Sequence, residues 1–132
     1  MTPSRATSGS CGFDLCALLE CETVIKPGET RLVPTGVALE IPGGFAGFVF
    51  ARSGLSTRFG INLINSVGVI DNDYRGEIKV GLFNSSKADY TLKNGERIAQ
   101  LVFMPVALPE LIEAEVLDQS GRGAGGFGST GK

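Results

Sequence analysis

Apolar residues alternate with polar or small residues along several stretches of the chain, which is the pattern of β-strands that bury one face. Residues 37–41 and 78–82 alternate in this way, and residues 98–103 form a mostly apolar run. These stretches predict three strands. No 12-residue stretch of the sequence has a clear helical period. Only residues 53–58 predict a short helix, with Ser53 as its N-terminal cap.

Turn-forming residues separate the predicted strands. Pro and Gly fall together at 26–28 and 41–44, and an Asn-Gly pair lies at 93–95. Short strands divided by turns at this spacing are typical of a sandwich, a jelly roll or a barrel. The chain has 132 residues, which suffices for one core. We therefore expect a single all-β domain over residues 1–118.

The C-terminal segment, residues 119–132, differs in composition from the rest. It contains six glycines and too few apolar side chains to build a core, which predicts a flexible arm. One interpretation is a simple tail; the other is a lid that becomes ordered on a ligand. Arg122 and Phe127 favour the lid, because a linker needs neither a guanidinium nor an aromatic ring.

Composition excludes several classes of chemistry. The chain has no histidine and no tryptophan, and its net charge is −2. Catalytic triads and histidine zinc sites are thereby excluded, and a broad basic surface for direct nucleic-acid binding is not expected. The three cysteines, without a signal-like segment, indicate an intracellular, reducing compartment and small packing residues. The longest apolar stretch is too short to span a membrane.

Three segments carry candidate chemistry. Arg52 follows an apolar strand, and together with Ser53 it could cradle a phosphate or simply start a helix. Asp71 directly follows another apolar stretch; it could be a general base for water or a solvated turn residue. Tyr74 could be a core aromatic or a surface for a sugar or base. Gln100 lies on an apolar strand, either as a structural cross-link or as a ligand contact.

Five segments in this order resemble the trimeric dUTPase family. They extend over almost the whole chain, and the third and fifth are long and specific. The segments are GFDL at 12–15, RSGL at 52–55, GVIDNDYRG at 68–76, RIAQL at 97–101 and RGAGGFGSTG at 122–131.

The resemblance implies a fold, an assembly and a reaction. The fold is a distorted jelly-roll barrel (β-clip) with one short helix, and three chains form a homotrimer whose active sites are shared between subunits. The reaction is Mg²⁺-dependent hydrolysis of dUTP to dUMP and pyrophosphate, with water attacking the α-phosphorus. It lowers dUTP, which keeps uracil out of DNA, and supplies dUMP for dTTP synthesis. Mg²⁺ is expected to be held mainly by substrate phosphates and water.

The resemblance also assigns roles to individual residues. Asp71 matches the catalytic carboxylate that orients and deprotonates the water, and Asp14 matches a supporting acid. The phosphate contacts match Arg52, Ser53, Gly54, Gln100, Arg122, Gly128 and Ser129. The uracil and deoxyribose contacts match Asn65, Val69, Ile70, Tyr74, Lys79 and Phe127.

Two alternatives share this fold. One is a catalytically inactive binding or signalling module; the other is a relative of dCTP deaminase. The survival of Asp71, Arg52 and Ser53 favours an enzyme over a binding module. The lack of a second acid placed for deamination, the uracil-type hairpin and the long C-terminal lid favour dUTP. The chain also departs from the family pattern, with Ala51 where Pro is common, Cys11 where Ala is common, and a short N-terminus.

Overall fold

The structure, a computed structural model that describes residues 2–126, consists mainly of antiparallel strands and contains one short helix. This confirms the all-β class predicted from the alternation of apolar residues. The strands are β1 (Phe13–Cys16), β2 (Thr23–Ile25), β3 (Thr30–Val37), β4 (Phe45–Ala51), β5 (Ile61–Leu63), β6 (Val67–Ile70), β7 (Ile78–Asn84), β8 (Tyr90–Leu92) and β9 (Arg97–Pro105). The helix is α1 (Ser53–Phe59).

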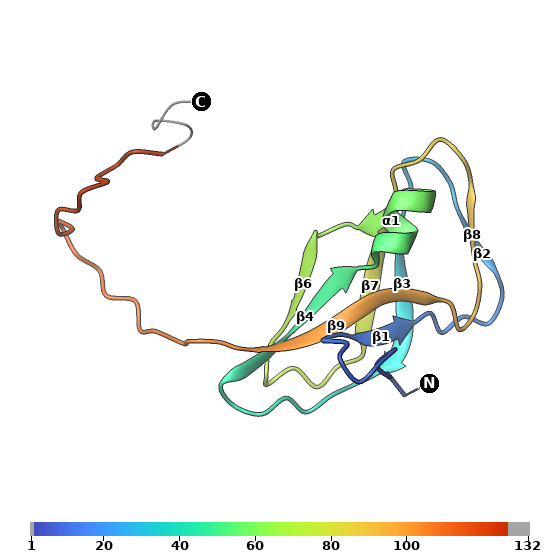
Figure 1. The fold of residues 1–132 in the computed structure, drawn as a ribbon, viewed down its shortest axis with the longest axis horizontal. Coiled ribbons are helices and arrows are strands. Elements are labelled where there is room, and N and C mark those ends of the chain that lie inside the picture. Colours follow the sequence, from blue (N-terminus) through green and yellow to red (C-terminus); the bar gives the residue numbers. More distant parts are fainter. Residues whose placement is uncertain (1, 127–132) are drawn as a thin grey trace.

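The strands form three sheets. The largest has the order β1-β9-β4-β6, the second has the order β3-β7-β5, and β2 pairs with β8. Figure 1 shows β7 and β3 behind the strands of the largest sheet, with the β2–β8 pair to one side. Strand β9 lies between β1 and β4, so segments from both ends and the middle of the chain meet along it.

The core lies between the two larger sheets. Leu15 and Leu101 from the first sheet and Val80 and Leu82 from the second are almost fully buried and belong to one continuous cluster. Burying one such side chain stabilises the fold by about 1.5–3 kcal/mol. Strand β7 buries alternate residues, as the sequence pattern predicts for residues 78–82.

The strand predicted over residues 37–41 is wrong beyond Val37. Strand β3 ends at Val37, which pairs with Ile78, although Ile41 is also buried. An irregularity in the register precedes this end, where Gly36 has a φ of 67°. Periodicity in the sequence indicates which side chains face the core. Residues 38–41 keep the alternation of buried and exposed side chains without pairing to a neighbouring strand.

Helix α1 confirms the predicted short helix but not its predicted cap. The N-cap is Arg52, whose backbone is extended and whose side chain makes no capping hydrogen bond. The carbonyl of Arg52 instead accepts hydrogen bonds from the backbone N–H groups of Leu55 and Ser56, each 3.1 Å long. Ser53 is therefore the first helical residue, and its hydroxyl is not needed to start the helix.

The cysteines only partly fit the expected packing role. Cys16 is half-buried, whereas Cys11 and Cys21 are exposed, and all three are free thiols. The prediction of small packing residues is therefore wrong for Cys11 and Cys21.

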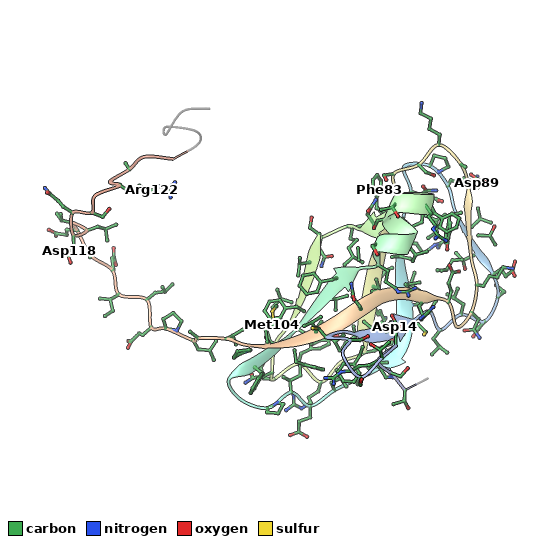
Figure 2. The ribbon with its side chains drawn as sticks, viewed as in Figure 1. Asp14, Phe83, Asp89, Met104, Asp118 and Arg122 are labelled. Carbon is green, nitrogen blue, oxygen red and sulfur yellow. The ribbon has the colours of Figure 1, made fainter. Side chains whose placement is uncertain are left out.

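The chain leaves the body after β9. Among residues 2–126, the last hydrogen bond that joins the arm to the body runs from the N–H of Val106 to the carbonyl of Gly44 over 2.9 Å, and residues 107–124 are exposed. Figure 1 shows this arm extending away from the sheets, and Figure 2 places Asp118 and Arg122 on it, far from Asp14. Within residues 2–126, no helix has the length and hydropathy to cross a membrane.

Candidate active site

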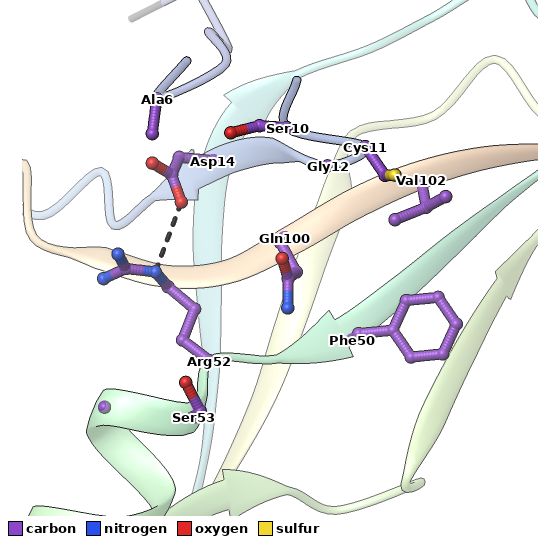
Figure 3. A pocket seen from close by; sticks show the side chains of 11 residues that line it. Ala6, Ser10, Cys11, Gly12, Asp14, Phe50, Arg52, Ser53, Gln100 and Val102 are labelled. Carbon is purple, nitrogen blue, oxygen red and sulfur yellow. Dashed lines mark ion pairs between the residues drawn. The ribbon is translucent and has the colours of Figure 1, made fainter. Parts of the chain in front are cut away.

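The predicted phosphate contacts of the body converge on one pocket. Arg52, Ser53, Gly54 and Gln100 line a pocket of about 360 Å³ together with Asp14. Figure 3 shows the side chains of Asp14 from β1, Gln100 from β9, and Arg52 and Ser53 from the junction of β4 and α1 around this pocket.

The register of the largest sheet explains this convergence. Gln100 on β9 pairs with Asp14 on β1 and with Phe50 on β4. Cross-strand partners lie about 4.5–5.5 Å apart, so these three segments must share one region of the surface. Arg52 follows β4 directly, which brings the first turn of α1 to the same place.

Asp14 holds the arginine of this pocket. Its Oδ1 lies 3.2 Å from Nε of Arg52, and its Oδ2 lies 3.2 Å from an Nη of Arg97. The Asp14 side chain is only 16% exposed, compared with 28% for Arg52 and 52% for Arg97. An Nη of Arg52 also donates a 3.2 Å hydrogen bond to the carbonyl of Arg97. The guanidinium of Arg52 is thus oriented before any ligand arrives.

Arg97 is a member of this network that the sequence analysis did not assign. It lies next to Asp14 only because β1 and β9 pair, and no local signal in the sequence indicates this contact. Half of its side chain remains exposed at the edge of the network.

Gln100 is both a cross-link and a pocket residue. Its Nε2 donates a 3.2 Å hydrogen bond to the carbonyl of Ala51, and the side chain lines the pocket. A Cβ on Gly12 would lie 3.0 Å from Oε1 and 3.2 Å from Cβ of Gln100. Gly12 therefore leaves room for the amide, which is a second positioning contact that the sequence analysis missed.

The first turn of α1 completes this pocket. Ser53 contributes a hydroxyl, and no atom lies within 4 Å of where a Cβ on Gly54 would be. The guanidinium of Arg52, the hydroxyl of Ser53 and the accessible backbone at Gly54 are groups that suit an anionic ligand.

The predicted base and sugar contacts gather in a different region. Val69, Ile70, Asp71, Tyr74 and Lys79 line a pocket of about 440 Å³ between β6 and β7. A smaller adjoining pocket of about 110 Å³ is lined by Asn65 together with Val69, Ile70 and Lys79.

A tight turn between β5 and β6 shapes this second region. Ser66 has a φ of 61°, and the N–H of Val67 donates a 2.6 Å hydrogen bond to the carbonyl of Asn65. A Cβ on Gly68 would lie 3.2 Å from Cβ of Val49. The start of β6 therefore packs closely on β4, which leaves only a small recess.

Asp71 and Tyr74 belong to the turn that follows β6. The N–H of Tyr74 donates to the carbonyl of Asp71 over 3.2 Å, and the Tyr74 hydroxyl donates to the carbonyl of Glu77 over 3.0 Å. Asp71 is exposed on the single chain. Its pocket shares no lining residue with the pocket of Arg52, so one chain does not bring these two side chains into one pocket.

The predicted lid residues are only partly described. Arg122 lies on the arm, where its Nε donates a 2.8 Å hydrogen bond to the carbonyl of Gly125. Phe127, Gly128 and Ser129 lie outside the described residues.

Comparison with known proteins identifies the family. The family model for dUTPase matches residues 1–131. The chain belongs to the dUTPase family. A deoxyuridine 5'-triphosphate nucleotidohydrolase from Desulfitobacterium hafniense is 52% identical over 130 residues, covering 98% of this chain and 86% of the relative.

Solved dUTPase structures share the fold. A mutant dUTPase of Staphylococcus bacteriophage 80alpha, solved with dUpNHpp, is 28% identical with a TM-score of 0.90, covering 100% of this chain and 92% of that chain. A mutant dUTPase from phage phi11 of S. aureus, solved with a coordinated structural Mg(II) ion, is 25% identical with a TM-score of 0.80, covering 90% and 92%. The β-clip jelly roll predicted from the resemblance to dUTPases is confirmed.

Proposed function

We propose that this chain hydrolyses dUTP to dUMP and pyrophosphate, with water attacking the α-phosphorus. The observation that carries the proposal is the pocket in which Asp14 orients Arg52 beside Ser53 and Gln100, in a chain of the dUTPase family. In the cell this reaction would keep uracil out of DNA and supply dUMP for dTTP synthesis. Free thiols at all three cysteines agree with an intracellular, reducing compartment.

The pocket of Arg52 would bind the triphosphate. Arg52 offers a guanidinium fork, and Ser53, the Gly54 backbone and the Gln100 amide offer further hydrogen-bonding groups. Because hydrolysis at phosphorus depends on charge neutralisation and alignment, a pre-oriented arginine contributes before the substrate arrives.

The region of the turn before β6 would select the nucleoside. Asn65 and the backbone at Val69, Ile70 and Lys79 border the small recess, which suits a planar uracil ring. A tight recess would reject a 5-methyl group by shape. Tyr74 would pack under the deoxyribose, where a ribose 2'-hydroxyl would collide with its ring.

Asp71 would orient the attacking water and accept its proton. Asp71 and Arg52 line separate pockets of one chain, which supports an active site built from more than one chain. We therefore propose a homotrimer with shared sites. Five large apolar side chains on the arm are 80% to 92% exposed on the single chain, and burial against other copies would remove them from water. They are Leu108, Leu111, Ile112, Val116 and Leu117.

Residues 119–132 would close over the site of the assembly as a lid, with residues 1–118 as the folded unit. Arg122 would meet the γ-phosphate, Phe127 would cover uracil, and Gly128 and Ser129 would add phosphate contacts. Closure would exclude bulk water and complete the site.

Mg²⁺ would enter with the substrate. Within residues 2–126, no group of three or more Cys, Asp or Glu side chains is placed to hold a metal ion. The side chains of these residues therefore fit an ion held mainly by phosphate oxygens and water, which are ligands that Mg²⁺ prefers. Bound Mg²⁺ neutralises charge on the phosphates.

Pyrophosphate release tests the proposal. The chain is incubated with Mg²⁺ and dUTP, UTP, dTTP or dCTP in parallel, and both pyrophosphate and ammonia are measured. Turnover of dUTP alone supports the assigned reaction and the nucleoside filter. Ammonia from dCTP would indicate a deaminase, and a folded assembly without any turnover would indicate a binding module.

A further inference from the structure

Tyr74 is held at both ends. Its N–H donates to the carbonyl of Asp71, and its hydroxyl donates over 3.0 Å to the carbonyl of Glu77, three residues ahead. The side chain thus folds over its own turn, and its ring lies against Gly76, one of the two residues between Tyr74 and Glu77. Tyr74 remains 45% exposed and lines the same pocket as Asp71.

Gly76 lies against this ring with no room for a side chain. A Cβ on Gly76 would lie 2.4 Å from the Tyr74 hydroxyl oxygen, 2.6 Å from Cζ and 3.0 Å from Cε2. Carbon atoms in contact normally lie about 3.5–4.0 Å apart. The ring would therefore have to shift by about 1 Å or more, which would also strain the hydrogen bond to Glu77.

The backbone does not itself require glycine at this position. Gly76 lies outside the left-handed region, in contrast to Gly36 or Gly44. An alanine could adopt its φ, so the overlap with Tyr74 is the feature that requires glycine here.

From this contact we infer that Gly76 is a positioning residue that sets the substrate selectivity of the site through Tyr74. The inference rests on the proposed function, in which the Tyr74 ring packs under the deoxyribose. The absence of a Cβ lets the ring lie close against its own turn, at the position where a 2'-hydroxyl would collide with it. A displaced ring would fit deoxyribose less closely and would reject ribose less strongly.

The kinetic test compares kcat/KM for dUTP and UTP in the wild type and in Gly76→Ala. We expect the dUTP-to-UTP ratio to fall by about tenfold or more, the range that a single misplaced contact in a pocket produces. Gly9→Ala is the matched control, because Gly9 also lies outside the left-handed region and no atom lies within 4 Å of its added Cβ. An unchanged ratio in Gly76→Ala would overturn the inference. Wild-type protein that does not hydrolyse dUTP would instead refute the proposed function.

A double-variant cycle separates positioning through Tyr74 from a general structural role. In the Tyr74→Ala background the ring is absent, so Gly76→Ala should change neither selectivity nor stability further. An equal effect in both backgrounds contradicts the inference. If Gly76→Ala alone does not fold, recovery of folding in the double variant supports the steric contact, and a double variant that also fails to fold overturns it.

Tyrosine fluorescence gives a readout that needs no substrate. The chain has two tyrosines and no tryptophan, so Tyr74 is the only strong fluorophore in a Tyr90→Phe background. Gly76→Ala in this background should change the acrylamide quenching of Tyr74, whereas Gly9→Ala should not. Identical quenching in all three proteins would show that the ring does not move, which contradicts the inference.

Discussion

Replacing Asp14 with asparagine removes the charge that orients Arg52 while keeping the shape of the side chain. The carboxylate contacts two arginines, each over 3.2 Å, and is itself largely buried. In the variant, the amide retains one accepting oxygen, and its NH₂ group faces a guanidinium that cannot accept a hydrogen bond. At least one of the two contacts must therefore break.

The size of the effect follows from the exposure of each pair. Breaking the partly buried ion pair between Asp14 and Arg52 costs more than the ~1 kcal/mol of an exposed pair and less than the ~3–5 kcal/mol of a fully buried one. The half-exposed contact to Arg97 contributes about 0–1 kcal/mol because solvent screens it. Since asparagine retains part of the first contact, we expect Asp14→Asn to lower the free energy of unfolding by about 1–2 kcal/mol. Freeing the Arg52 side chain costs a further ~1.5 kcal/mol of ordering on substrate binding, which lowers kcat/KM about tenfold.

Two assays measure these effects. Urea unfolding followed by circular dichroism, at one fixed protein concentration, gives the stability, and pyrophosphate release gives kcat/KM for dUTP. Glu22→Gln is the control, because it breaks a 3.7 Å ion pair with Lys93 in which both side chains are mostly exposed, and it should change stability by less than about 0.5 kcal/mol. Wild-type stability and turnover in Asp14→Asn would refute the role of Asp14 in orienting Arg52.

Three further outcomes are expected. Asp71→Asn should keep nucleotide binding, measured by calorimetry, but lose turnover by about a hundredfold or more; near-normal turnover would contradict its assignment as the base. Truncation after Gly121 should leave circular dichroism unchanged and lower dUTP turnover, because the last described tie of the arm to the body is at Val106; loss of folding would make the tail structural. Burial, and then the hydrogen bond and charge of Glu96, raise the pKa of Tyr90 above its ordinary value of 10.0. Above pH 10.0 the unfolded chain therefore releases a proton that the folded chain keeps, so stability should fall as pH rises further, and by less in Tyr90→Phe. Urea unfolding at about pH 9 and about pH 11 checks this difference.

The sequence pattern predicts burial better than it predicts pairing. Alternation correctly placed β7, because Ile78, Val80 and Leu82 are all buried in the core. The same alternation continues through Ile41 although the strand ends at Val37, since a hydrophobic face does not require a hydrogen-bonded neighbour. The cap predicted at Ser53 falls on Arg52 instead, because the cap is defined by backbone conformation and an adjacent serine does not fix it.

In the candidate site too, the sequence predicts individual residues better than contacts between residues that lie far apart along the chain. Motifs identify Arg52 and Ser53 as pocket residues, and the resemblance assigns Asp14 a supporting role. The contact between Asp14 and Arg97 joins residues 83 positions apart and depends on the register between β1 and β9. Similarly, the need for glycine at position 76 follows from where the Tyr74 ring lies, which no local pattern specifies.

The separation of the two pockets has a consequence for mixtures of defective chains. If each active site combines the Asp71 pocket of one chain with the Arg52 pocket of another, two different inactive alleles can complement each other. Co-refolding equal amounts of Asp71→Asn and Arg52→Ala chains would then leave about a quarter of the sites with both side chains intact. A site drawn from a single chain would give no recovery. If the sites are shared in this way, two individually inactive copies of the gene expressed together would restore dUTP hydrolysis.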